Sequence, residues 1–135
     1  TPLEDQISVF KQQLLLAEKH KKAVILHCVS AYQEVIEIKK QLKITVPMII
    51  HGFSKNIQVA QSLYKNGFYL SFGKYLLRNP ELLNVLKQIP TEFLFLETDM
   101  IEETIDQVYA KAQSVLETDV EKLIEHNYIK VFNRD

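Results

Sequence analysis

The chain has 135 residues, a length typical of one compact domain, and 47% of them are hydrophobic, enough to form a buried core. Its 16 lysine and arginine side chains nearly balance 17 aspartate and glutamate side chains, so the formal net charge is −1. This balance excludes a broad basic nucleic-acid-binding surface, and any contact with a polyanion has to be local or mediated by a metal.

Apolar residues at helical spacing alternate with short, continuously apolar runs, which predicts helices separated by buried strands. Pro2 at a first helical position, Gly67 as a C-terminal stop and the Thr118/Glu121 capping box mark three of the helix boundaries. In chain order, we expect a helix over residues 1–19, a strand over 23–26, a helix over 30–42, a strand over 47–50, a helix over 54–66, a strand over 68–72, a helix over 79–89, a strand over 93–96, and helices over 102–116 and 118–127.

The spacing of the expected strands predicts an α/β fold with a parallel sheet. The strands end at His27, His51, Phe72 and Glu97, which lie 21 to 25 residues apart with a helical pattern in each gap. A TIM (β/α)8 barrel uses about 31 residues per unit, so four strands amount to half of one barrel. A small open doubly wound sheet is the other architecture that this pattern allows.

Side chains that can bind a metal follow three of the four expected strands. These are His27, His51 and the pair Glu97 and Asp99, whereas the third strand ends at Ser71 and Phe72 without one. Because the carboxyl ends of parallel strands meet at one edge, a single site is expected there. Two imidazoles and a carboxylate suit zinc or another transition ion, and further carboxylates favour manganese or magnesium. Such a site supports metal-assisted hydrolysis.

Structural roles remain open for these residues. A histidine at a strand end is often hydrogen-bonded to a neighbouring carbonyl, Asp99 is placed to cap the next helix, and Glu97 is placed to pair with a lysine. The other histidines, His20 and His126, are expected on helix surfaces.

Four further residues with reactive or charged side chains follow the ends of expected strands. Cys28 follows His27 and is expected to turn to the opposite face as a buried thiol, which disfavours a Cys/His nucleophile pair. As the only cysteine it forms no intramolecular disulfide, which favours a reducing, cytoplasmic setting. Lys55, Lys74 and Arg78 follow strand ends, where they either hold phosphates or remain solvated.

Two classes of protein are excluded by absences in the sequence. The three glycines lie too far apart for a Rossmann turn or a P-loop. No apolar run approaches the ~18 residues of a membrane span, and no signal-peptide pattern is present, so no membrane partner is expected.

Four blocks of the sequence resemble one known family in both order and spacing. They are QISVFKQQL at residues 6–14, VILHCVSA at 24–31, IIHGFS at 49–54 and LETD at 96–99, and NYIKVF at 127–132 resembles the closing segment. On these residues the chain is similar to the TatD family of metal-dependent deoxyribonucleases.

The resemblance implies a TIM-barrel hydrolase that cleaves phosphodiester bonds of DNA with one or two divalent metal ions, magnesium, manganese or zinc. By position, His27, His51 and Asp99 are the implied metal ligands, Asp99 is also the implied catalytic residue, and Glu97 is a neighbour at the same edge. Ser71 falls on the strand that the family leaves without a ligand.

The chain resembles only strands five to eight of the family's barrel. The first-half His-x-His pair and the bridging Glu of the family do not precede Thr1, so the 135 residues alone are expected to be inactive. The opening at Thr1 rather than Met suggests processing or a piece of a longer protein. The alternative is a non-catalytic half-barrel, a binding or structural module that either pairs with a missing N-terminal half or self-associates through open sheet edges.

Overall fold

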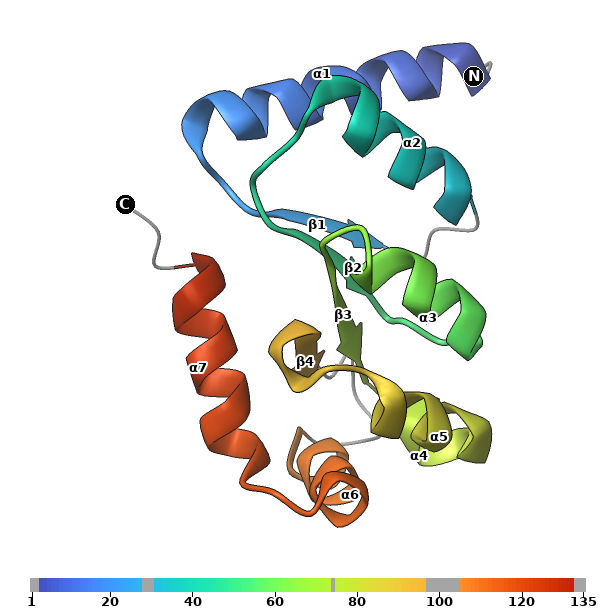
Figure 1. The fold of residues 1–135 in the computed structure, drawn as a ribbon, viewed down its shortest axis with the longest axis vertical. Coiled ribbons are helices and arrows are strands. Elements are labelled where there is room, and N and C mark those ends of the chain that lie inside the picture. The colour runs from blue at the N-terminus through green and yellow to red at the C-terminus, as the bar shows by residue number, and fades with distance from the viewer. Residues whose placement is uncertain (1–2, 28–30, 74, 97–104, 133–135) are drawn as a thin grey trace.

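Four parallel strands form the centre of the structure, a computed structural model that describes residues 3–27, 31–73, 75–96 and 105–132 (Figure 1). The strands pair in the order in which they occur in the chain, which leaves no point where the order reverses. The predicted α/β fold with a parallel sheet is therefore confirmed, and the reversal that defines a doubly wound sheet is absent from the described strands. The strands are β1 (Val24–His27), β2 (Met48–His51), β3 (Phe68–Phe72) and β4 (Leu94–Leu96).

Helices connect and cover these strands. None of the described helices combines the length and the apolar composition that a membrane crossing needs. In chain order they are α1 (Leu3–His20), α2 (Tyr32–Leu42), α3 (Ile57–Tyr64), α4 (Tyr75–Arg78), α5 (Pro80–Gln88), the 3-10 turn η1 (Thr91–Phe93), α6 (Ile105–Leu116) and α7 (Val120–Phe132).

Asparagine caps determine where two of the helices begin. The side-chain Oδ1 of Asn79 accepts the Glu81 N–H at 3.1 Å, and Pro80 occupies the first helical position of α5. The Oδ1 of Asn56 accepts the Val59 N–H at 3.0 Å. This cap starts α3 at Ile57, so the prediction of a helix from residue 54 is wrong by one turn.

Other elements also differ from the prediction. α4 is a single turn, too short for a periodic pattern, and it was not predicted. Asp119 rather than Thr118 caps α7, because its Oδ1 accepts the Lys122 N–H at 3.2 Å, and α7 continues to Phe132 rather than ending at residue 127. Phe93 belongs to η1, so β4 begins one residue later than expected. The predicted start at residues 1–2 and residues 102–104 lie outside the described residues.

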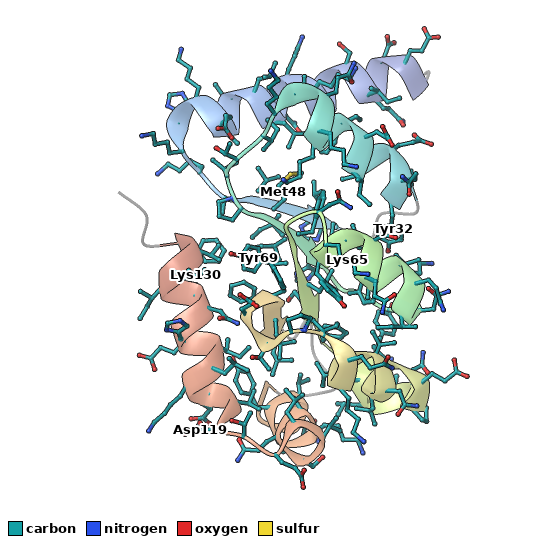
Figure 2. All side chains as sticks on the ribbon, in the orientation of Figure 1. Tyr32, Met48, Lys65, Tyr69, Asp119 and Lys130 are labelled. Carbon is teal, nitrogen blue, oxygen red and sulfur yellow. The ribbon has the colours of Figure 1, made fainter. Side chains whose placement is uncertain are left out.

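Alternation along the strands gives the sheet two different faces. One face lies under helices and is buried along β2, β3 and β4, whereas Val24 and Leu26 of β1 are only partly buried on it, and Lys39 of α2 places its Nζ 5.8 Å from the ring of Phe68 there. On the opposite face α7 covers the β3 and β4 side, with the Lys130 Nζ 6.0 Å from the ring of Tyr69 (Figure 2). The β1 side of that face is open, since the side chain of Ile25 is 49% exposed.

Glu18, near the end of α1, ties this helix to the segment that precedes β2. Its carboxylate accepts hydrogen bonds from the Thr45 N–H at 2.7 Å, from the Val46 N–H at 3.0 Å and from the Thr45 hydroxyl. Hydrogen bonds to a charged group are stronger than those between neutral groups. The carboxylate therefore satisfies two backbone donors that no strand partner reaches.

Replacing Glu18 with alanine is expected to lower the free energy of unfolding by about 2 kcal/mol, because two backbone N–H groups lose a charged acceptor. Chemical denaturation measures this change. Glu37→Ala, an exposed glutamate on α2, is the control and is expected to change stability by less than about 0.5 kcal/mol. Equal changes in the free energy of unfolding for the two substitutions would contradict a stabilising role for the Glu18 hydrogen bonds.

Candidate metal centre

Two predicted ligands, His27 and His51, lie side by side at the carboxyl ends of β1 and β2. They are direct partners in the parallel register, and their ring centroids are 4.8 Å apart with an interplanar angle of 57°. Paired residues on neighbouring strands project from the same face, so both rings belong to the face that carries Ile25. The structure thus brings together two of the three side chains that the sequence assigns to the metal.

The backbone after His51 is anchored to β3. Gly52 has φ of +69°, a left-handed conformation that favours glycine, and it turns the chain away from the strand. The Phe53 N–H then donates to the carbonyl oxygen of Ser71 at 2.9 Å, and the buried Phe53 ring meets Phe72 edge-on with centroids 5.6 Å apart. These contacts limit the positions that the end of β2, and with it the His51 side chain, can adopt.

The pair lies where solvent and a ligand can reach it. His27 is exposed and His51 is partly buried. One strand further on, Ser71 follows the Leu70 that pairs with Ile50, and it is 4% exposed. The strand that lacks a metal ligand therefore carries a buried hydroxyl-bearing residue at the level of the two histidines.

The remaining predicted site residues divide into two groups. Asp99, Glu97, Cys28 and Lys74 lie outside the described residues, and among those that are described no cluster of three or more His, Cys, Asp or Glu side chains occurs. His20, His126, Lys55 and Arg78 are described and exposed, the two histidines on α1 and α7.

The two imidazoles fit a divalent metal by chemistry and by separation. Imidazole nitrogen is a preferred ligand of zinc and of other transition ions. Metal–nitrogen bonds are about 2.0–2.1 Å long, so rings whose centroids lie 4.8 Å apart can bind one ion from two sides. The pair supplies only part of a coordination shell, and further ligands are needed to complete it.

Comparison with known proteins identifies the family. Residues 1–133 match the sequence profile of the TatD related DNases. The chain belongs to the TatD related DNase family. It is 35% identical over 104 residues to the uncharacterized metal-dependent hydrolase MG009 of Mycoplasma genitalium, a match that covers 72% of this chain and 40% of the relative. It is 34% identical over 104 residues to the uncharacterized metal-dependent hydrolase YabD of Bacillus subtilis, covering 73% and 40%.

A solved structure of the same family has the same fold. The TatD homolog YJJV of Escherichia coli superposes with a TM-score of 0.84 at 23% identity, covering 98% of this chain and 58% of that protein. Other relatives of this TatD family chain carry nuclease names, namely the deoxyribonuclease Tat-D of Schizosaccharomyces pombe at 27% identity over 100 residues and the 3'-5' RNA nuclease TATDN2 of Homo sapiens at 33% over 104 residues. The chain spans well under two thirds of each of these proteins.

Sequence reasoning missed one feature of this region, a cavity between the segment after β2 and helix α5. Its walls come from residues more than twenty positions apart, so no local pattern marks it. The available signal was an asparagine directly before each of two helices, Asn56 before α3 and Asn79 before α5.

Proposed function

We propose that the full-length protein is a metal-dependent hydrolase that cleaves phosphodiester bonds of DNA. The observation that carries the proposal is the pair of His27 and His51, register partners whose rings lie 4.8 Å apart at the carboxyl edge of the sheet. Family membership and relatives named as metal-dependent hydrolases and as a deoxyribonuclease support it. The near-zero net charge agrees with a substrate bound through a metal rather than through a basic surface.

In this proposal His27, His51 and Asp99 hold the divalent ion. When bound, such an ion lowers the pKa of water and polarises a phosphoryl oxygen. The two imidazoles bind through ring nitrogens from one face of the sheet, and the anchor from Phe53 to Ser71 keeps His51 in place during binding. Asp99, which comes three residues after the end of β4 in the sequence, is the proposed third ligand and catalytic carboxylate.

We further propose that the four strands are the second half of a TIM barrel. The strand order agrees with a barrel, and the chain covers 58% of the TatD homolog from Escherichia coli. The exposed Ile25 on β1 marks where the remaining strands would pack. In this proposal, residues of the full-length protein outside these 135 positions complete the metal site.

Removing the metal from full-length protein is expected to abolish DNA hydrolysis. After treatment with EDTA, cleavage of a fluorescently labelled DNA oligonucleotide should fall to the uncatalysed background. Adding back Mg²⁺, Mn²⁺ or Zn²⁺ should restore it for at least one ion, because the ion supplies the activated water. An RNA oligonucleotide of the same sequence tests the choice of sugar. Hydrolysis that persists unchanged in EDTA would refute the proposal.

A non-catalytic module is the second candidate function, favoured by one observation. β1 forms an edge of the described sheet, and Ile25 beside that edge is an exposed apolar side chain. If the 135 residues act alone, they are expected to self-associate, and sedimentation velocity at increasing protein concentration measures this. They are also expected to bind no metal tightly, because the described ligands make an incomplete shell. Tight stoichiometric metal binding by the 135 residues would contradict this candidate.

A further inference from the structure

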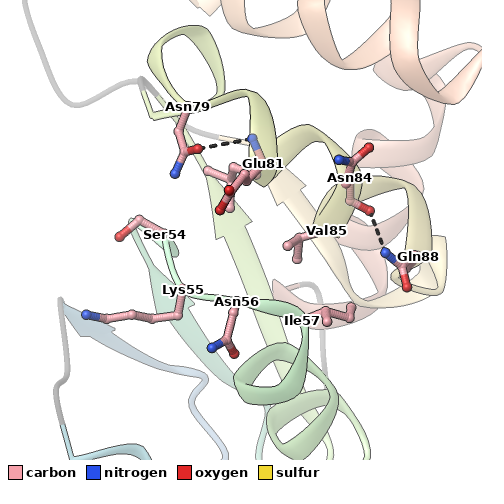
Figure 3. A pocket seen from close by; sticks show the side chains of 10 residues that line it. Ser54, Lys55, Asn56, Ile57, Asn79, Glu81, Asn84, Val85 and Gln88 are labelled. Carbon is pink, nitrogen blue, oxygen red and sulfur yellow. Dashed lines mark hydrogen bonds between the residues drawn. The ribbon is translucent and has the colours of Figure 1, made fainter.

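A cavity of about 380 Å³ lies between the segment that follows β2 and the helix α5 (Figure 3). Residues 54–57 form one wall, and residues from Asn79 to Gln88 form the other. Both walls follow the carboxyl ends of strands, the same edge of the sheet that carries His27 and His51. The volume lies within the range of small-molecule pockets, about 300–1,000 Å³.

The inner surface of the cavity combines an apolar floor with one carboxylate. Ile57, Leu82 and Val85 provide the floor, and the last two are 1% and 6% exposed. The Glu81 side chain points into the cavity from α5, whereas the Lys55 side chain points away from it (Figure 3). The cavity therefore combines an apolar patch, most accessible at the partly buried Ile57, with a negatively charged hydrogen-bond acceptor.

Two of the three asparagines in the walls, Asn56 and Asn79, act as helix caps. The Oδ1 of Asn56 accepts the Val59 N–H, and the Oδ1 of Asn79 accepts the Glu81 N–H. Among the described lining side chains, Glu81 is thus the strongest acceptor that the helices leave available to a ligand. A ligand that fits has to bring an N–H donor and an apolar face.

This combination disfavours a phosphate and suits a nucleobase. A phosphate would face the Glu81 carboxylate without the Lys55 ammonium beside it, and like charges repel. A nucleobase has an apolar face that packs on aliphatic side chains and an edge with N–H donors that a glutamate accepts. Enzymes that take a base out of the stack hold it between aromatic or apolar side chains and read its edge through hydrogen bonds.

We propose that this cavity binds a base of the single-stranded nucleic acid whose backbone lies at the His27 and His51 edge, an inference that rests on the proposed function. Ser54, at the rim, follows His51 by three residues, so their Cα atoms lie at most about 11 Å apart. A few nucleotides span that distance, since a stacked strand rises about 3.4 Å per nucleotide. The cavity is then a base subsite next to the metal-binding edge.

The test compares two nuclease-resistant phosphorothioate probes bound to full-length protein with Mg²⁺ present, a hexadeoxycytidylate and a hexamer of the same backbone without bases. Glu81→Ala is expected to weaken binding of the cytosine hexamer about 10-fold and to leave binding of the abasic hexamer unchanged or slightly stronger. Glu81→Gln, which keeps the shape of the side chain, is expected to give a smaller loss in the same direction. Fluorescence anisotropy measures both affinities.

A matched control separates base binding from effects on helix stability. Glu34 occupies the first turn of α2 as Glu81 does that of α5, and it lies outside the cavity. Glu34→Ala is expected to leave both affinities unchanged. The free nucleotide dCMP tests whether the cavity binds a base within a strand or a free nucleotide. It should bind more weakly than the cytosine hexamer, because it does not span both the cavity and the metal-binding edge.

The outcomes distinguish this inference from the proposed function. The base subsite would be wrong if Glu81→Ala weakened the affinity for both hexamers equally, or if the unaltered protein bound both hexamers with the same affinity. Either result would leave the hydrolase proposal standing. Binding of dCMP as tight as that of the hexamer would overturn the single-strand assignment. Failure to bind either hexamer would overturn the base subsite, while the EDTA experiment on unmodified DNA decides the hydrolase proposal separately.

Discussion

Replacing His51 with alanine is expected to lower kcat/KM for DNA hydrolysis by the full-length protein by at least about 100-fold. Loss of a residue that only orients a metal ligand costs 10- to 100-fold in affinity or activity, and loss of a ligand itself costs more. His27→Ala is expected to act in the same direction, because the two rings are register partners. Metal bound per chain, measured by mass spectrometry of the element, should fall together with the rate.

Two histidines far from the strand ends provide the control. His20 lies at the end of α1 and His126 on α7, and both are exposed. Alanine at either position is expected to change kcat/KM by less than twofold. If His51→Ala and His126→Ala had the same metal content and rate, the assignment of the metal centre would be wrong. Circular dichroism of each variant excludes loss of folding as the cause.

Asn127→Ala is expected to destabilise the protein by about 2–4 kcal/mol. Asn127 is 1% exposed, and its Nδ2 donates to the carbonyl oxygens of Thr91 and Leu94, both at 2.8 Å. The substitution leaves two carbonyl groups without this donor and opens a cavity between α7 and the start of β4. Urea unfolding measures the change in the free energy of unfolding.

A different asparagine serves as the comparison for this experiment. The Nδ2 of Asn66 donates to the Ser62 carbonyl oxygen in an exposed turn. Asn66→Ala is expected to cost less than about 0.5 kcal/mol, because water replaces the lost bond. A loss at Asn127 no greater than at Asn66 would show that the bridge from α7 contributes little.

The four strands could be predicted because each is a short apolar run between helical stripes, and such runs need little context. The first residues of α3 and α7 could not be predicted as accurately as the strands. Several polar residues near each start can cap a helix, and only the backbone geometry shows that Asn56 and Asp119 do so. The four-residue α4 makes barely one turn, so no apolar spacing repeats within it.

Only part of the candidate site could be predicted from the sequence as well. The proximity of His27 and His51 could be predicted, because both residues end a strand and parallel strands align their carboxyl ends. The direct register and the anchor from Phe53 to β3 depend on hydrogen bonds between distant segments. The cavity beside Glu81 depends on how α5 packs against residues 54–57, which spacing along the chain does not encode.

The uneven covering of the sheet restricts how a second copy could add to it. α7 packs beside β4, while the β1 edge and Ile25 remain open, so two copies would join through β1. A twofold axis perpendicular to the sheet makes the two β1 strands antiparallel, and the histidine pairs then point to opposite ends. A twofold axis along the strands keeps them parallel but turns the histidine pairs to opposite faces. In neither symmetric dimer do the two histidine pairs share a site, so joining two copies through β1 does not by itself combine their imidazoles around one metal ion.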